Sequence, residues 1–99
     1  MDKKFEAKLR WLKPEEGGRL CPPVGPKYVT VVRFESKKQE WLIEAWSLIV
    51  EFKSSPNNEL EHHVDVSFLV PEGPNELLVK GSAFELMEGA QTVAKGVII

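Results

Sequence analysis

The sequence predicts an all-β domain folded as a small antiparallel barrel or sandwich. Apolar and polar residues alternate in several segments, turn residues separate these segments at short intervals, and a strand-like run continues to the terminus. A final strand at a sheet edge would expose unpaired N–H and C=O groups, so we expect it to form a seam that closes the sheet. With 99 residues, of which 42% are hydrophobic, the chain is expected to form a single domain over residues 1–99 with one core.

Two strands are predicted in the first third of the chain. Residues 5–11 alternate apolar and charged side chains with a period of two, and Pro14 ends this run. Residues 15–19 (Glu-Glu-Gly-Gly-Arg) are expected to form a loop. Residues 20–26 contain too many prolines for a helix or an interior strand, so we expect them to cross one end of the domain. Residues 28–34 alternate again and are rich in β-branched and aromatic side chains, which favours the second strand.

The segment over residues 36–53 carries both helical and strand signals. Ser36 followed by Gln39 resembles a helix capping box, and apolar residues then recur at helical spacing. The second half of the segment also alternates as a strand does. We therefore predict a strand over 46–53, entered through a helical turn or an irregular stretch over 37–44.

Three further strands are predicted after the turn at residues 54–58. Residues 60–70 alternate as one long antiparallel-type strand, and the Pro- and Gly-containing segment 71–75 turns the chain again. Residues 82–88 and 91–99 form the closing pair. The total is six strands at short spacing, which is typical of a small barrel or sandwich.

Two glycines shape the closing pair. Gly89 is expected to make the turn, and Gly96 interrupts the last strand, where glycine usually marks a bulge or another backbone passing close by. The inward positions of the strands predict one core that includes Leu9, Trp11, Val32, Leu48, Val50, Val66, Phe68 and Phe84.

Composition and charge exclude several classes of function. No apolar stretch approaches the roughly 20 residues of a membrane helix, and no signal-peptide pattern follows the charged N-terminus, so we expect a cytoplasmic protein with no membrane partner. Cys21 is the only cysteine, which excludes an intramolecular disulfide. The net charge of −2 conceals an asymmetry, because residues 1–38 carry ten Lys/Arg and five Asp/Glu whereas residues 39–99 carry three and ten.

The sequence predicts neither catalysis nor a metal or cofactor. His62 and His63 are neighbours on a predicted strand, so their rings point to opposite faces and cannot readily share one ion. Cys21 has no base beside it, and paired carboxylates such as Glu15-Glu16 lie in loops. No phosphate-binding loop motif is present, so no nucleotide is expected.

Motifs in three parts of the chain resemble the C-terminal domain of elongation factor Tu. They are Phe5-Glu6-Ala7, then Glu15-Glu16-Gly17-Gly18-Arg19, and finally Glu88-Gly89 with Thr92-Val93 and Gly96-Val97, in the same order as in that family. The resemblance implies a six-stranded closed antiparallel β-barrel. In elongation factor Tu this barrel contacts the T-stem of aminoacyl-tRNA, the other domains and the exchange factor. The residues for GTP hydrolysis belong to other domains of that family.

Two functions follow from this resemblance as expectations. The first is a stand-alone protein-interaction module with a translation-related protein partner, whose expected contacts are Glu15, Arg19, Trp41, Glu88, Gly89 and Gln91. The alternative is a barrel that binds tRNA or another RNA through Lys27, Arg33, Glu88 and Gly89. Because RNA binding needs a clustered basic face, and only three basic residues follow position 38, the protein partner ranks first.

Overall fold

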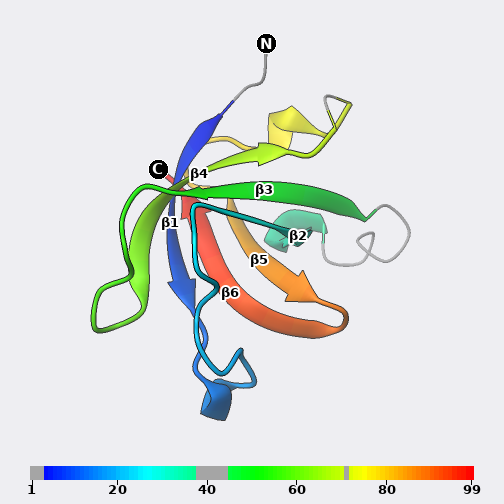
Figure 1. Cartoon of the computed structure of the whole chain (residues 1–99). Coiled ribbons are helices and arrows are strands. Elements are labelled where there is room, and N and C mark those ends of the chain that lie inside the picture. Colours follow the sequence, from blue (N-terminus) through cyan, green and yellow to red (C-terminus); the bar gives the residue numbers. More distant parts are fainter. Residues whose placement is uncertain (1–3, 38–44, 71) are drawn as a thin grey trace.

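The computed structural model of the chain describes residues 4–37, 45–70 and 72–99 (Figure 1). Every segment that the sequence predicts as a strand forms one. The strands are β1 (Phe5–Trp11), β2 (Lys27–Phe34), β3 (Trp46–Phe52), β4 (Glu61–Phe68), β5 (Ala83–Glu88) and β6 (Gln91–Ile98). Short 3₁₀ turns lie between them, namely η1 (Pro14–Glu16), η2 (Glu35–Lys37) and η3 (Asn75–Leu77). Among the described residues, no helix is long and apolar enough to cross a membrane.

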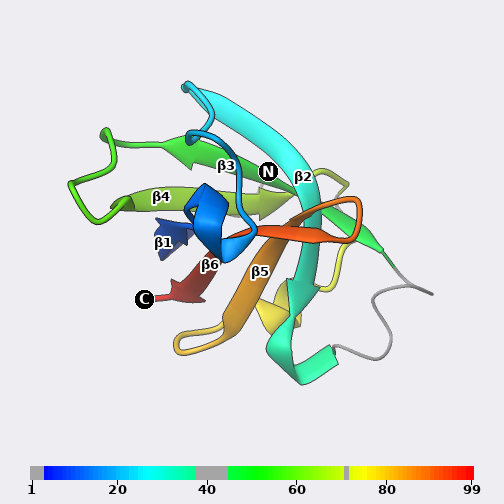
Figure 2. The same cartoon turned by 90° about the horizontal axis from the view of Figure 1, so that it is seen from below.

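The six strands form one closed antiparallel barrel in the order β1-β4-β3-β2-β5-β6 (Figures 1 and 2). β6 pairs with β1, with Leu9 opposite Gly96, so the last strand is the seam that the sequence predicts. Closure gives the last strand neighbours on both sides, β5 and β1, and leaves the sheet without an edge.

Because apolar residues alternate with polar ones, every second side chain along a strand points into the barrel. All eight residues predicted for the core belong to it, and Leu9, Leu48, Val50 and Val66 have no exposed surface. The cluster also contains Ala7, Phe34, Val64, Leu78, Leu86, Val93, Ala94 and Ile98. A closed barrel of this size is filled by its own side chains, so its interior is a packed core.

Two details of the strands differ from the sequence predictions. The strand expected over 60–70 ends at Phe68, because the pairing of β4 with β3 ends there. Leu69 and Val70 lie beyond it and are 52% and 40% exposed. At Gly96 the close neighbour is a side chain: a Cβ there would lie 2.5 Å from Cζ of Phe84. The irregularity in this strand pair lies instead between Leu86 and Met87. The expected entry over 37–44 falls almost entirely outside the described residues.

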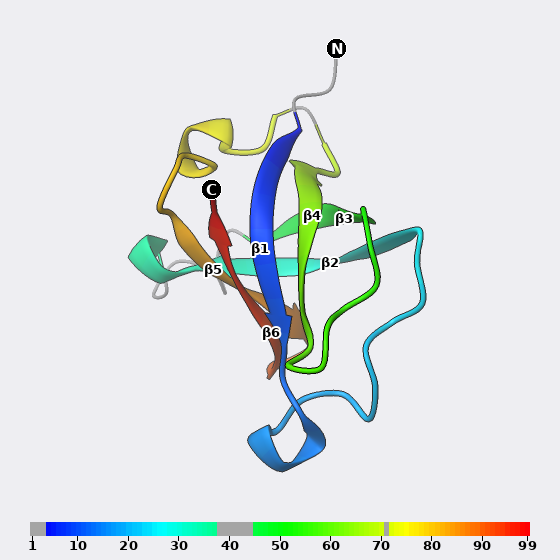
Figure 3. The same cartoon turned by 90° about the vertical axis from the view of Figure 1, so that its left-hand side faces the viewer.

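Antiparallel strands send successive connections to alternate ends of the barrel. Residues 12–26, 53–60 and 89–90 therefore meet at one end, which we call the loop end (Figure 3). Residues 69–70 and 72–82, with η3, lie at the opposite end. The fold thus brings the Glu-Glu-Gly-Gly-Arg loop beside the Glu88-Gly89 turn.

Candidate interaction surface at the loop end

The first loop folds back on itself through its two glycines. Gly17 has a φ of +87°, a conformation that only glycine adopts without strain. A Cβ on Gly18 would lie 2.2 Å from the carbonyl oxygen of Leu12, so a side chain there would collide with the backbone. The N–H groups of Glu16 and Gly18 both donate to the carbonyl of Lys13, at 2.9 Å each. The loop is consequently a compact turn and delivers Arg19 to a defined position.

Arg19, Tyr28 and Glu88 form one hydrogen-bonded cluster from three elements. Oε2 of Glu88 accepts hydrogen bonds from the Arg19 guanidinium and from the Tyr28 hydroxyl. The guanidinium also lies over the Tyr28 ring, 5.7 Å from its centroid, and its Nε donates to the carbonyl of Cys21 at 3.1 Å. The Arg19 side chain therefore attaches the proline-rich segment to β2 and to the end of β5.

The charges in this cluster stabilise one another. The hydrogen bond from Tyr28, with that from Arg19, holds the pKa of the Glu88 carboxyl below its usual value against the opposing effect of burial. Glu88 in turn raises the pKa of Arg19, and burial raises the pKa of Tyr28. At neutral pH the Arg19 guanidinium and the Glu88 carboxylate are therefore ionised and the Tyr28 hydroxyl stays protonated, so the cluster is a charge-assisted link between the loops.

Gln91 provides a second link across the loop end. Its side-chain amide donates to the carbonyls of Gly17 and Gly18, the latter at 3.0 Å. Gly89, with a φ of +62°, makes the turn that places Glu88 and Gln91 on adjacent strands. The structure thus brings together Arg19, Glu88, Gly89 and Gln91, four of the six residues that we expect to contact a partner.

The two remaining residues of that prediction stand apart from the cluster. Glu15 is exposed within η1 and takes no part in these hydrogen bonds. Trp41 lies outside the described residues. η2, which contains Ser36, contacts β5, whose first residues lie at the barrel end opposite Glu88.

Both cations of the RNA alternative lie beside carboxylates. Arg33 is directed at Glu85, with Nε 2.8 Å from Oε1, and the Glu85 side chain is 6% exposed. Lys27 is 64% exposed and lies 3.8 Å from Glu51. Ion pairs occupy seven lysine and arginine side chains in the part of the chain that the structure describes: Lys4, Lys8, Arg10, Arg19, Lys27, Arg33 and Lys53.

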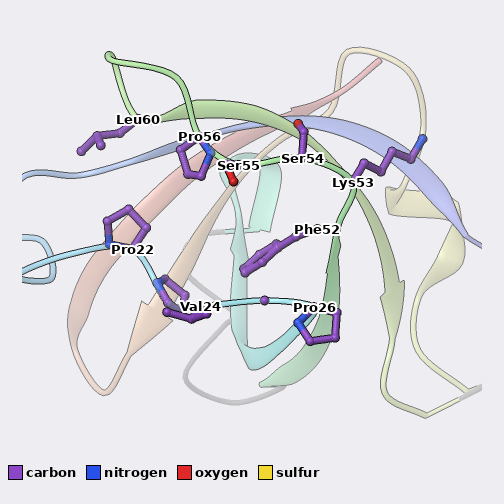
Figure 4. Close-up of a pocket in the computed structure, with 11 residues that line it drawn as sticks. Pro22, Val24, Pro26, Phe52, Lys53, Ser54, Ser55, Pro56 and Leu60 are labelled. Atoms are coloured by element: carbon purple, nitrogen blue, oxygen red, sulfur yellow. The ribbon is translucent and has the colours of Figure 1, made fainter.

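A pocket of about 570 Å³, which the sequence did not predict, lies at the same end of the barrel (Figure 4). Its walls are the proline-rich residues 22–26 and the β3–β4 connection around residues 53–56, with the ring of Phe52 between them. Two aliphatic side chains of the same proline-rich segment project into solvent, Leu20 at 89% and Val24 at 91% exposure. The sequence feature that indicates this apolar surface is the presence of Leu20 and Val24 in a proline-rich segment, which cannot form an interior strand or a helix.

The histidines and the cysteine have separate environments. His62 is 6% exposed, accepts a hydrogen bond from the Trp11 indole at 2.9 Å, and lies 2.8 Å through Nδ1 from the carbonyl of Ser54, whereas His63 is exposed. The two rings therefore point apart, as predicted. The thiol of Cys21 is exposed. Within residues 4–37, 45–70 and 72–99, no group of three or more His, Cys, Asp or Glu residues could hold a metal ion.

Comparisons with known proteins do not identify a family. No family model matches the chain, and no curated protein matches it. The resemblance to elongation factor Tu therefore stays a prediction, which depends on the quoted motifs.

Proposed function

We propose that this chain is a non-catalytic protein-interaction module that binds its partner through the loop end of the barrel. The observation that supports the proposal best is the exposure of Leu20 and Val24, at 89% and 91%, next to an apolar pocket. Single exposed aliphatic residues are common. Two of them in one stiff segment that borders a pocket form the kind of apolar surface that a partner covers.

The loops that carry this surface are held in place before any partner binds. Glu88 links Arg19 to Tyr28, and Gln91 ties the two loops together through the carbonyls of Gly17 and Gly18. A rigid surface loses less conformational entropy on association. Binding residues on loops that a rigid scaffold positions are also a common arrangement.

A translation-related partner and a cytoplasmic location belong to the same proposal. The partner class follows from the resemblance to the C-terminal domain of elongation factor Tu, whose Glu-Gly junction matches Glu88-Gly89. The location follows from the single exposed thiol of Cys21, which suits a reducing compartment.

RNA binding is the second candidate, and the same Glu88-Gly89 junction favours it. The ion pairs of Arg19 and Arg33 with Glu88 and Glu85 argue against it, because a phosphate would have to compete with a carboxylate for each guanidinium. We therefore rank it below the protein partner.

Capture of a partner from host lysate tests the proposal. The bait is the purified protein, the lysate is treated with nuclease, and the variants are Leu20→Asp and its matched control Leu69→Asp, which changes a half-exposed leucine beyond the opposite end of β4. We expect the wild type and Leu69→Asp to capture a protein from the lysate that Leu20→Asp does not capture. Arg19→Ala should weaken that complex by about 2 kcal/mol or more.

Binding of bulk tRNA at two salt concentrations decides between the candidates. The protein-interaction proposal predicts no tight binding at about 50 mM salt and none at about 200 mM salt. Tight binding that falls steeply with salt, and that Lys27→Ala or Arg33→Ala weakens, would replace the proposal with the RNA alternative.

A further inference from the structure

We propose that the pocket between residues 22–26 and 53–56 receives an uncharged aromatic side chain of the partner polypeptide. This inference rests on the proposed function and names what the partner must contribute at the loop end. Three properties of the pocket support it: preformed walls, the absence of an inward-facing charge, and an aromatic floor.

Hydrogen bonds to backbone carbonyls fix both walls of the pocket. The N–H of Phe52 donates to the carbonyl of Pro26 at 2.8 Å, which joins the proline-rich wall to the end of β3. Nδ1 of His62 lies 2.8 Å from the carbonyl of Ser54 in the opposite wall. Because the indole of Trp11 can only donate, Nε2 of His62 is the acceptor, so Nδ1 carries the hydrogen and donates it in a hydrogen bond to the carbonyl of Ser54.

The close approach of the proline-rich wall to the Phe52 ring depends on Gly25. A Cβ on Gly25 would lie 2.6 Å from a ring carbon of Phe52, so only glycine allows the proline-rich segment to pass this close to the ring. The β3–β4 connection is also ordered, since Oδ1 of Asn57 accepts hydrogen bonds from the N–H groups of Glu59 and Glu61 at 2.9 Å each. The pocket is therefore formed without a ligand, and filling it requires little further ordering.

No charged group faces the inside of the pocket. Lys53 is the one charged residue among those that line it, and its ammonium group is turned away (Figure 4). That group lies 3.1 Å from Glu6 and 3.0 Å from Asp65, on the outer surface of the barrel. A charged occupant would lose hydration without gaining a counter-charge, so the pocket selects a neutral one.

The floor of the pocket favours an aromatic occupant over an aliphatic one. The Phe52 ring lies between the walls in Figure 4 and belongs to an aromatic group that extends inward. It meets the Trp11 ring edge to face, with centroids 6.2 Å apart, and its centroid lies 5.2 Å from that of His62. A further ring in the pocket would extend this group, and aromatic pairs gain attraction beyond the area they bury.

Amide chemical shifts from NMR titrations with three small probes test the inference. The probes are N-acetylphenylalaninamide, N-acetylleucinamide and N-acetylphenylalanine, which carries a carboxylate. We expect the phenylalanine amide to shift the amides of Phe52, Ser54 and Ser55 and to bind at least about threefold more tightly than the leucine amide. The probe with the carboxylate should bind no more tightly than its neutral counterpart.

A matched pair of variants localises the binding. Val24→Asp puts a charge on the proline-rich wall at a side chain that is 91% exposed, so the fold should tolerate it. Val79→Asp makes the same change at a 55% exposed valine at the opposite end of the barrel. We expect Val24→Asp to weaken binding of the phenylalanine amide at least about threefold and Val79→Asp to leave it unchanged.

The outcomes separate this inference from the proposed function. Shifts that map elsewhere, or equal binding of the leucine and phenylalanine amides, overturn the inference, even where Leu20→Asp still abolishes partner capture. Binding at the pocket with the expected preference, together with a partner lost in both Leu20→Asp and Val24→Asp, supports it. Probe binding without any Leu20-dependent protein partner overturns the proposed function and with it the source of the aromatic side chain.

Discussion

Replacing Trp11 with phenylalanine should destabilise the barrel by about 2–4 kcal/mol, because the change removes a buried hydrogen-bond donor as well as ring volume. Trp11 is 1% exposed, and its indole N–H lies 2.9 Å from Nε2 of His62, itself 6% exposed. Leaving that nitrogen without a partner costs about 1–3 kcal/mol. The smaller ring leaves a void that costs about 1 kcal/mol more.

Urea unfolding at neutral pH measures this loss. For a domain of this size, the corresponding fall in melting temperature is about 10–30 °C. A double-mutant cycle with His62→Leu isolates the hydrogen bond between Trp11 and His62, since the double variant has an apolar group on both sides of it. The bond from His62 to the carbonyl of Ser54 is lost in His62→Leu and in the double variant alike, so that loss cancels in the cycle. We expect the double variant to be less destabilised than the sum of the single variants by about 1 kcal/mol or more.

Additivity of the two single variants would refute this reasoning. If the destabilisation of the double variant equals the sum of the single variants within about 0.5 kcal/mol, Trp11 and His62 contribute independently, through packing alone. Retention of wild-type stability by Trp11→Phe would refute it more directly, because neither the void nor the orphaned nitrogen would then matter.

Four further predictions concern the core, the loop end and metal content. Phe68→Ala should destabilise the domain by about 3–5 kcal/mol in urea unfolding. Gly96→Ala should destabilise it by about 1–3 kcal/mol, since the added Cβ would lie 2.5 Å from the Phe84 ring. Adding Phe84→Leu to Gly96→Ala should restore part of the stability that Gly96→Ala loses. The hydrogen bond from Tyr28 lowers the pKa of Glu88 in the folded state. The ionised carboxylate therefore stabilises the fold above the unfolded-state pKa, and this contribution is lost as pH falls through the folded-state pKa. Glu88→Gln should reduce the drop in urea midpoint between about pH 6 and about pH 3, and an unchanged drop would contradict a stabilising role of the Glu88 carboxylate. A chelator should leave the melting temperature unchanged, and stoichiometric zinc in protein purified without an affinity tag would contradict this.

The strands themselves could be predicted from the sequence because their signal is local. A period of two separates the inner and outer faces of a strand whatever strand lies beside it, so Trp11 and Val66 could both be placed in the core before any pairing was known. Turn residues act locally as well, and Gly89 makes the turn that its position suggests. The extent of a strand is less local, since β4 ends at Phe68 where the barrel wall stops although the alternation continues.

The interactions between strands were decided only by the tertiary structure. Arg33 reads as an exposed cation in the sequence, yet β2 pairs with β5 in a register that sets it opposite Glu85. Likewise, Arg19 and Glu88 are 69 positions apart, and only the barrel order places their loops together. The pocket at Phe52 arises in the same way, from two connections that meet at one end of the barrel. Local alternation thus determined which side chains face inward, whereas strand order and register, which depend on contacts between distant segments, determined which residues meet.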